Sequence, residues 1–220
     1  MPPNDKPDDK PPATPANSSP QVQPPAASTL PVKPAWKKPT VVIWVLLAVC
    51  ALFSIDLYVK YWAFQNVAQV PVVLTKANAQ DPDFWHHYPH ASKPIIPKIL
   101  ALRLTTNRGA VFGIGQGKQV VFIIVTVIAV ITITWIFCRS EENAWPTHLA
   151  LVCILAGALG NFYDRVTYGV VRDMFLLFPE TRIFPWIFNV ADVLLDIGVV
   201  LALYIILFLQ PKQEAQAPQG

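Results

Sequence analysis

Residues 119–138 form the segment that most limits what this chain can fold into. They read QVVFIIVTVIAVITITWIFC and carry no charge between Lys118 and Arg139. A helix of this length covers roughly 30 Å at about 1.5 Å a residue, which matches the hydrocarbon core of a bilayer. The segment therefore predicts a helix that crosses a membrane.

An earlier segment predicts a first spanning helix that contains two charges. Residues 40–55 are uncharged, and a span of about 40–62 results only if the helix also includes Asp56 and Lys60. These two residues are four apart, so they share one face of a helix and can pair there. Pairing is expected because an unpaired charge is costly at that depth in a membrane.

Two later segments complete a set of four spans. The third covers residues 143–163 and the fourth covers residues 189–209. The third contains small residues that allow neighbouring helices to approach closely: Ala156, Gly157, Ala158 and Gly160. In the whole chain 53% of the residues are hydrophobic and 14% are charged, against roughly 25% charged in an ordinary soluble domain. The composition thus agrees with an integral membrane protein.

The two ends of the chain are predicted to be tails on the same side of the membrane. Residues 1–39 hold 12 of the 22 prolines and cannot bury a core, which predicts a disordered tail. Residues 210–220 form a second tail. The Lys and Arg counts of the loops do not decide which side is which, but Lys37 and Lys38 before the first span favour a cytoplasmic N-terminus.

The long connection between the first two spans predicts a small β element. Leu100, Leu102 and Leu104 alternate with less apolar residues, a period of two that is typical of a strand. Residues 81–98 contain four prolines and are predicted to be a loop. We therefore expect an all-α integral membrane fold, with four transmembrane helices and a small β-rich extracytoplasmic cap.

Several classes of site and partner are not indicated. A net charge of +3 without a basic stripe argues against nucleic-acid binding. His86, His87 and His90 hint at a metal site, but the proline beside them and the absence of an HExxH pattern argue against one. His148 is interpreted as a packed or interfacial group. The three cysteines lie in apolar runs without CxxC spacing: Cys50, Cys138 and Cys153. We expect no metal and no cofactor.

Two aspartates close to the spans are the candidates for chemistry. Asp173 follows the third span and Asp192 enters the fourth, and a loop between two neighbouring helices can return both to nearly the same depth. Two carboxyl groups that close cannot both ionise easily, so one serves as a base and the other as an acid, as in aspartic proteases. The alternative is that Asp173 caps a turn and Asp192 caps the fourth helix.

A set of short motifs favours the first interpretation. The chain has, in this order, DLYVK at 56–60, NRGAVF at 107–112, GALGNFYDR at 157–165, GVVRD at 169–173 and FNVAD at 188–192. On four spans, these segments resemble the lipoprotein signal peptidase family, signal peptidase II. The resemblance covers about residues 40–209, and it is the combination of motifs that is specific.

The resemblance implies a function as well as a site. By it, Asp173 and Asp192 match the catalytic aspartates, and six further residues match supporting or substrate-binding positions: Asp56, Asn107, Gly109, Asn161, Arg165 and Asn189. The implied enzyme is a membrane aspartic endopeptidase that cleaves diacylglyceryl-modified bacterial prolipoproteins before the lipidated cysteine. It would lie in the cytoplasmic (inner) membrane among its lipids, with both termini cytoplasmic and the active site near the periplasmic face.

Some assignments remain open at the level of sequence. Asn161 can instead bond across helices as a structural residue, and Arg165 can simply pair with Asp164, for which a structural salt bridge is the preferred interpretation. The stretch between Lys60 and Asn107 is longer than expected for the family, Met174 stands where an aromatic residue is more usual, and Asp196 is an additional acid one helical turn after Asp192.

Three other functions compete with the peptidase. A proton relay or small transporter could use Asp56, Lys60, Asp192 and Asp196, although the chain lacks an internal repeat. A membrane scaffold built on the small residues of the third span leaves the aspartates and asparagines unexplained. A metalloprotease centred on the histidines would be sensitive to chelators.

Overall fold

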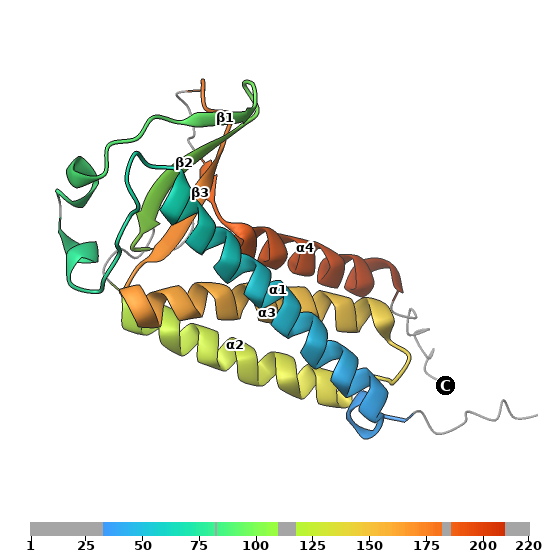
Figure 1. Ribbon diagram of the computed structural model, residues 1–220. Coiled ribbons are helices and arrows are strands. Elements are labelled where there is room, and N and C mark those ends of the chain that lie inside the picture. The colour runs from blue at the N-terminus through green and yellow to red at the C-terminus, as the bar shows by residue number, and fades with distance from the viewer. Residues whose placement is uncertain (1–32, 82, 110–117, 182–185, 210–220) are drawn as a thin grey trace, which may run out of the picture. The chain divides into compact units, whose positions relative to one another are not determined.

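Four helices make up most of the part of the chain described by the computed structural model, residues 33–81, 83–109, 118–181 and 186–209 (Figure 1). They are α1 (Pro39–Asn66), α2 (Gln119–Arg139), α3 (Trp145–Tyr168) and α4 (Val190–Tyr204), the last continued by the π-helical turn Ile205–Leu209. Each is long and apolar enough to cross a membrane. The four predicted spans are therefore confirmed as helices of that kind.

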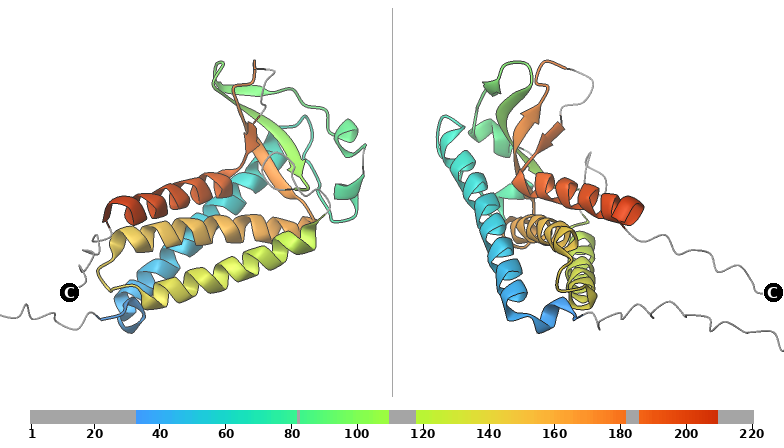
Figure 2. Two further views of the ribbon diagram at one scale, coloured as in Figure 1. Left: turned by 180° about the vertical axis from the view of Figure 1, so that it is seen from behind. Right: turned by 90° about the vertical axis from the view of Figure 1, so that its right-hand side faces the viewer.

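Helix α3 is the central helix, since it contacts each of the other three (Figures 1 and 2). Half of its apolar window is buried, against 6% for α2. Glycines make this packing possible, because a Cβ atom at Gly157 would collide with the carbonyl oxygen of Ala191 and with Leu195 on α4. The small residues of the third span thus hold α4 in a fixed position against α3.

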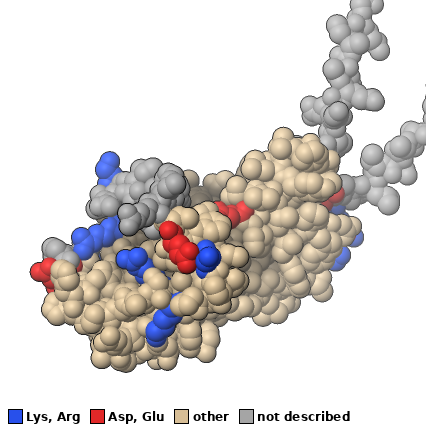
Figure 3. Space-filling model, turned by 90° about the horizontal axis from the view of Figure 1, so that it is seen from above, with Lys and Arg blue, Asp and Glu red and all other residues tan. Residues whose placement is uncertain are grey.

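Charge is distributed as expected for helices that cross a membrane. The charged side chains visible in Figure 3 gather near the strands and at the opposite end of the helices, with mostly uncharged surface between them. Many large hydrophobic side chains of the helices are exposed, among them Leu47, Val120 and Leu207. In a membrane these side chains face lipid rather than water.

A four-stranded antiparallel sheet lies beyond one end of the helices (Figure 2). Its strands are β1 (Lys93–Ile96), β2 (Leu100–Asn107), β3 (Val171–Leu177) and β4 (Trp186–Phe188), in that spatial order. The predicted strand at residues 100–105 is confirmed within β2. The pairing of β2 with β3 shifts register between Leu102 and Thr105, so β2 has one residue more than β3 over this stretch, as in a β-bulge.

The predicted loop at residues 81–98 is wrong in two places. A 3-10 turn occupies Phe84–His87, and β1 occupies Lys93–Ile96 although it contains Pro94. Proline is tolerated here because β1 is at the edge of the sheet and pairs only with β2.

A hydrophobic cluster joins the sheet to the end of α1. It contains Phe64 and Val67 from α1, Phe84 from the 3-10 turn, Leu104 from β2 and Met174 from β3. Met174 is fully buried in it. The methionine that replaces the more usual aromatic residue at this position therefore packs in the cluster. The cluster fixes β3, and hence the neighbouring Asp173, relative to the helices.

Candidate active site

Asp173 lies within a strand rather than at a turn. It is the third residue of β3 and pairs across the sheet with Thr105. Its side chain is 2% exposed. The capping alternative for Asp173 is therefore wrong, and a carboxyl group stands buried where the sheet meets the helices.

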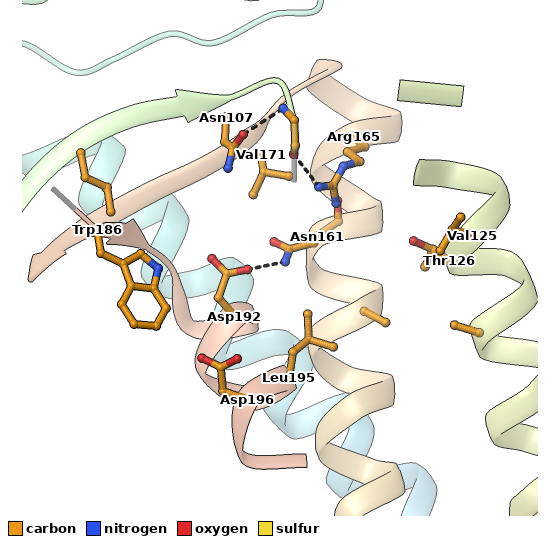
Figure 4. A pocket seen from close by; sticks show the side chains of 14 residues that line it. Asn107, Val125, Thr126, Asn161, Arg165, Val171, Trp186, Asp192, Leu195 and Asp196 are labelled. Atoms are coloured by element: carbon orange, nitrogen blue, oxygen red, sulfur yellow. Dashed lines mark hydrogen bonds between the residues drawn. The ribbon is translucent and has the colours of Figure 1, made fainter. Parts of the chain in front are cut away.

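Asp192 lies in the first turn of α4, and Asn189 precedes that helix. Asn189 is the N-cap, its Oδ1 accepting from the backbone N–H of Asp192 at 3.0 Å, while the Oδ2 atom of Asp192 accepts from the backbone N–H of Asn189 at 3.2 Å. This is a capping box, so Asp192 contributes to the helix cap from its third position. It also accepts from Nδ2 of Asn161 at 2.8 Å (Figure 4).

Asn189 connects the two aspartates. Its Nδ2 donates to Oδ1 of Asp173 at 2.6 Å and to Oδ1 of Asn161 at 3.2 Å, while its backbone N–H binds Asp192. Asn189 is fully buried. The two carboxyl groups that the sequence places 19 residues apart are thus both bound by one residue, Asn189.

The environment of Asp173 favours its protonated form. Burial, and secondly the nearby charge of Asp192, raise the pKa of Asp173 to about 8, against the opposing effect of side-chain hydrogen bonds from Asn189 and Asn107. Near pH 7 this carboxyl therefore holds its proton. The two aspartates differ in access as well, because Asp192 is only partly buried.

A buried ion network lies beneath these residues. Lys60 is 0% exposed and its Nζ lies 2.8 Å from Oδ2 of Asp56, 3.2 Å from Oδ2 of Asp164 and 3.3 Å from Oδ1 of Asn161. The predicted Asp56–Lys60 pair is confirmed. Because Oδ1 of Asn161 accepts from Lys60 and Asn189, its Nδ2 is left to donate to Asp192.

Asp56 also positions the start of α4. Its Oδ1 accepts from the backbone N–H of Ala191 at 2.8 Å, one of the N–H groups that a helix start leaves without an intrahelical partner. A Cβ atom at Gly160 would collide with Asp56. Close approach of α1, α3 and α4 at this level therefore requires glycine at residue 160.

The structural salt bridge expected for Asp164 is confirmed, but the alternative that Arg165 simply pairs with Asp164 is wrong. Asp164 does form a salt bridge, but with Lys60 and with Arg172, whose Nη2 and Nε lie 2.7 Å and 3.1 Å from Oδ1. Consecutive residues of a helix point in different directions, so Arg165 faces elsewhere. Its guanidinium donates to the carbonyl oxygens of Gly109 at 3.2 Å and Asn161 at 3.4 Å.

The segment after β2 brings the remaining predicted residues to the same place. The backbone N–H of Gly109 donates to Oδ1 of Asn107 at 2.9 Å, and the side chain of Asn107 hydrogen-bonds to Asp173. Residues 110–112 of the NRGAVF motif lie outside the described residues. All eight predicted site residues are thus connected by hydrogen bonds in one region, whereas Lys60 and Arg172 are central residues that the predicted site omitted.

A cavity of about 340 Å³ opens beside this network (Figure 4). The polar residues that line it include Asn107, Gly109, Asn161, Arg165, Asp192 and Asp196. The apolar residues that line it include Val125 and Ala129 of α2, Leu195 of α4 and Trp186 of β4. A largely apolar lining with a few polar groups is typical of a site that binds a substrate.

Comparison with protein families identifies the family of the chain. The model of signal peptidase (SPase) II matches residues 48–208. The chain belongs to the signal peptidase II family. The family resemblance expected from the sequence motifs is therefore confirmed, and the chain is a membrane protein of a peptidase family.

Individual relatives agree with the family. A lipoprotein signal peptidase of Streptococcus thermophilus is 32% identical over 161 residues, covering 73% of this chain and 90% of the relative. One from Streptococcus pneumoniae is 43% identical over 108 residues, covering 49% of this chain and 69% of the relative.

Solved structures agree as well. A bacterial membrane enzyme determined by the in meso method is similar with a TM-score of 0.60 and 28% identity, over 78% of this chain and 94% of that chain. A second such structure has a TM-score of 0.58 and 30% identity, over 74% of this chain and 92% of that chain. This signal peptidase II chain thus shares its fold with membrane enzymes.

Proposed function

We propose that this signal peptidase II chain is an aspartic endopeptidase that removes signal peptides from diacylglyceryl-modified bacterial prolipoproteins. It cleaves before the lipidated cysteine by means of water activated by Asp173 and Asp192. The observation that carries the proposal is the shared hydrogen bonding of both carboxyl groups to Asn189. The names of the relatives, lipoprotein signal peptidases, support the substrate class.

The two aspartates take different parts in the reaction. Asp192 lines the cavity and is the base that takes a proton from the attacking water. Asp173, with its pKa raised to about 8 by burial and by Asp192, carries the proton that stabilises the oxygen of the scissile carbonyl as negative charge develops there.

The bond changes balance without a covalent enzyme intermediate. The oxygen of water bonds to the carbonyl carbon, the carbon–nitrogen bond breaks, and the proton taken by Asp192 is delivered to the amine of the departing cysteine. The products are a signal peptide with a free carboxylate and a lipoprotein with a new N-terminal amine. No cofactor takes part in these steps.

The supporting residues position substrate and acids. Asn161 orients Asp192 by donating to it at 2.8 Å, and Arg165 fixes Gly109 through its carbonyl oxygen. Asn107 and Gly109 also line the cavity, where an extended peptide backbone can bind. Asp56 acts indirectly, by binding a backbone N–H group at the N-terminus of α4.

We propose that the sheet and the adjoining active site face the periplasm and that both termini are cytoplasmic, in the inner membrane. Signal peptides are removed after export, so a site that cleaves them belongs on the outer side. Lys37 and Lys38 at the opposite end of α1 from the sheet agree with a cytoplasmic N-terminus. In this orientation the lipid chains of the substrate remain in the bilayer.

Cleavage of a lipid-modified prolipoprotein by purified enzyme tests the proposal. The Asp173→Asn and Asp192→Asn variants are each expected to lose turnover by about 10²- to 10⁴-fold, since each removes a group that acts on the reacting atoms. Asp196→Asn is the comparison, because it removes an acid from the same helix face. Near wild-type turnover in either of the first two variants would refute the dyad, and loss in Asp196→Asn alone would move the second acid one turn deeper.

A further inference from the structure

Asp196 is an aspartate within the fourth membrane-spanning helix that takes no part in the hydrogen-bond network around Asp173 and Asp192. It is exposed on α4 and lines the cavity together with Asp192. Among the described residues it has no hydrogen-bond or ion-pair partner. An ionisable group at this level of a span is costly and is expected to have a function.

The position of Asp196 is fixed by the packing of α4. Gly157 admits Ala191 and Leu195, and a Cβ atom at Gly198 would collide with Ile154 of α3, so α4 cannot rotate without losing these close contacts. The carboxyl groups of Asp192 and Asp196 consequently lie on the same side of α4, the side on which the indole of Trp186 stands (Figure 4). Whatever occupies the cavity beside Asp192 also passes Asp196.

We propose that Asp196 is a specificity-determining residue that accepts a hydrogen bond from a hydroxyl side chain of the signal peptide. This rests on the proposed function. Asp196 is four residues beyond Asp192, about 6 Å along the helix axis, and an extended peptide advances about 3.3 Å per residue. The hydroxyl therefore belongs to the second residue before the lipidated cysteine.

The signal peptide, and not the mature chain, is the part of the substrate that reaches Asp196. After export the signal peptide stays in the bilayer, whereas the chain beyond the cysteine continues outside it. Asp196 lies on the membrane side of Asp192, towards the middle of α4. A serine or threonine hydroxyl is uncharged and can enter this depth, and it offers the donor that a carboxylate lacks.

Matched prolipoprotein substrates test this assignment, with threonine or valine as the second residue before the cysteine, because the two side chains have the same shape. Wild-type enzyme is expected to cleave the threonine substrate with a kcat/KM about tenfold higher or more, as for a hydrogen bond to a charged group. Asp196→Leu should reduce this ratio to about one, while Asp196→Asn, which keeps an acceptor oxygen, should retain part of it. Threonine moved to the fourth residue before the cysteine should give no preference.

The outcomes separate this inference from the proposed function. Equal cleavage of both substrates by the wild type would overturn the role of Asp196 and leave the peptidase proposal standing. An equal loss of both activities in Asp196→Leu, or an equal shift of both pH profiles, would also overturn it, because Asp196 would then act on Asp192 or on the fold. Cleavage of neither substrate by the wild type would overturn both proposals. Thermal unfolding of each variant shows that it is folded.

Discussion

Asp173 and Asp192 share one hydrogen-bonding partner, Asn189, whose side chain donates to the first at 2.6 Å and whose backbone N–H donates to the second at 3.2 Å. The same residue caps α4. The helix start and the proposed acid pair therefore depend on one residue. Any change at Asn189 acts on both, and the two effects can be separated by choosing what replaces it.

Asn189→Ser is expected to lower kcat on the order of 100-fold while leaving the fold intact. Serine is as good an N-cap as asparagine, but it is too short to reach Asp173 as well, and misplacement of a reacting group by about an ångström is enough for such a loss. Steady-state cleavage kinetics measure it.

Asn189→Ala serves as the partner variant. This variant loses the cap of α4 as well as the hydrogen bond to Asp173, so about 1 kcal/mol of stability should be lost together with the activity. If the serine variant instead lost stability and kept its kcat, Asn189 would be a helix cap and nothing more.

The pH profile of cleavage should fall on its alkaline side near pH 8. Burial and the charge of Asp192 raise the pKa of Asp173 to about 8, and the proposed mechanism needs this carboxyl protonated. The value of kcat/KM, measured from about pH 5 to pH 10, reports this ionisation of the free enzyme. A profile that stays flat to about pH 10 would mean that Asp173 is not the proton donor.

Stability should depend on pH through the same group. An aspartate in the unfolded chain titrates near 4, so between about pH 4 and pH 8 the folded state holds a proton that the unfolded state has lost. The stability that this proton provides is complete below about pH 4 and declines up to about pH 8, by about 1.4 kcal/mol per pH unit. Asp173→Asn mimics the protonated form. Thermal unfolding should therefore show the variant gaining on the wild type as pH rises, and a constant difference would contradict this.

The spans could be predicted from sequence because an uncharged run of the right length has few other uses. The Asp56–Lys60 pair could be predicted as well, since a spacing of four fixes one helical face. Strand β1 could not, because its proline is permitted only by its place at the sheet edge, and local sequence does not state which strand is at the edge.

The connections of the candidate site depend on tertiary structure for the same reason. Arg172 reaches Asp164 because the chain reverses after α3 at Gly169, a residue in the left-handed conformation with φ of 77°, so that β3 returns alongside the end of the helix. From the sequence alone, Arg165 is a candidate partner of Asp164 because the two residues are adjacent in the chain. The several partners of Asn161 likewise come from α1, from α3 itself and from the start of α4, a combination that no single motif expresses.

Activity should be insensitive to chelators. The described residues contain no group of three His, Cys, Asp or Glu side chains that could hold a metal ion. His90 is engaged by the carbonyl oxygens of Tyr88 and Leu104, and His86 by Asp83. Incubation with excess chelator should change the cleavage rate by less than about twofold, and so should the paired substitution His86→Ala and His87→Ala. Loss of activity that added zinc restores would favour the metalloprotease hypothesis.

Lys60→Met should destabilise the protein and inactivate it for separable reasons. Removal of Lys60 leaves Asp56 buried without a cation, since among the described residues Arg172 forms its ion pair with Asp164 and not with Asp56, and breaking a buried pair in this way costs about 3–5 kcal/mol. The combined variant Lys60→Met with Asp56→Asn removes the unpaired charge and keeps an acceptor for Ala191, so its thermal stability should largely recover. Its kcat should stay low, because Oδ1 of Asn161 has still lost the ammonium group that orients its amide towards Asp192. Recovery of kcat together with stability would show instead that Lys60 serves only the fold.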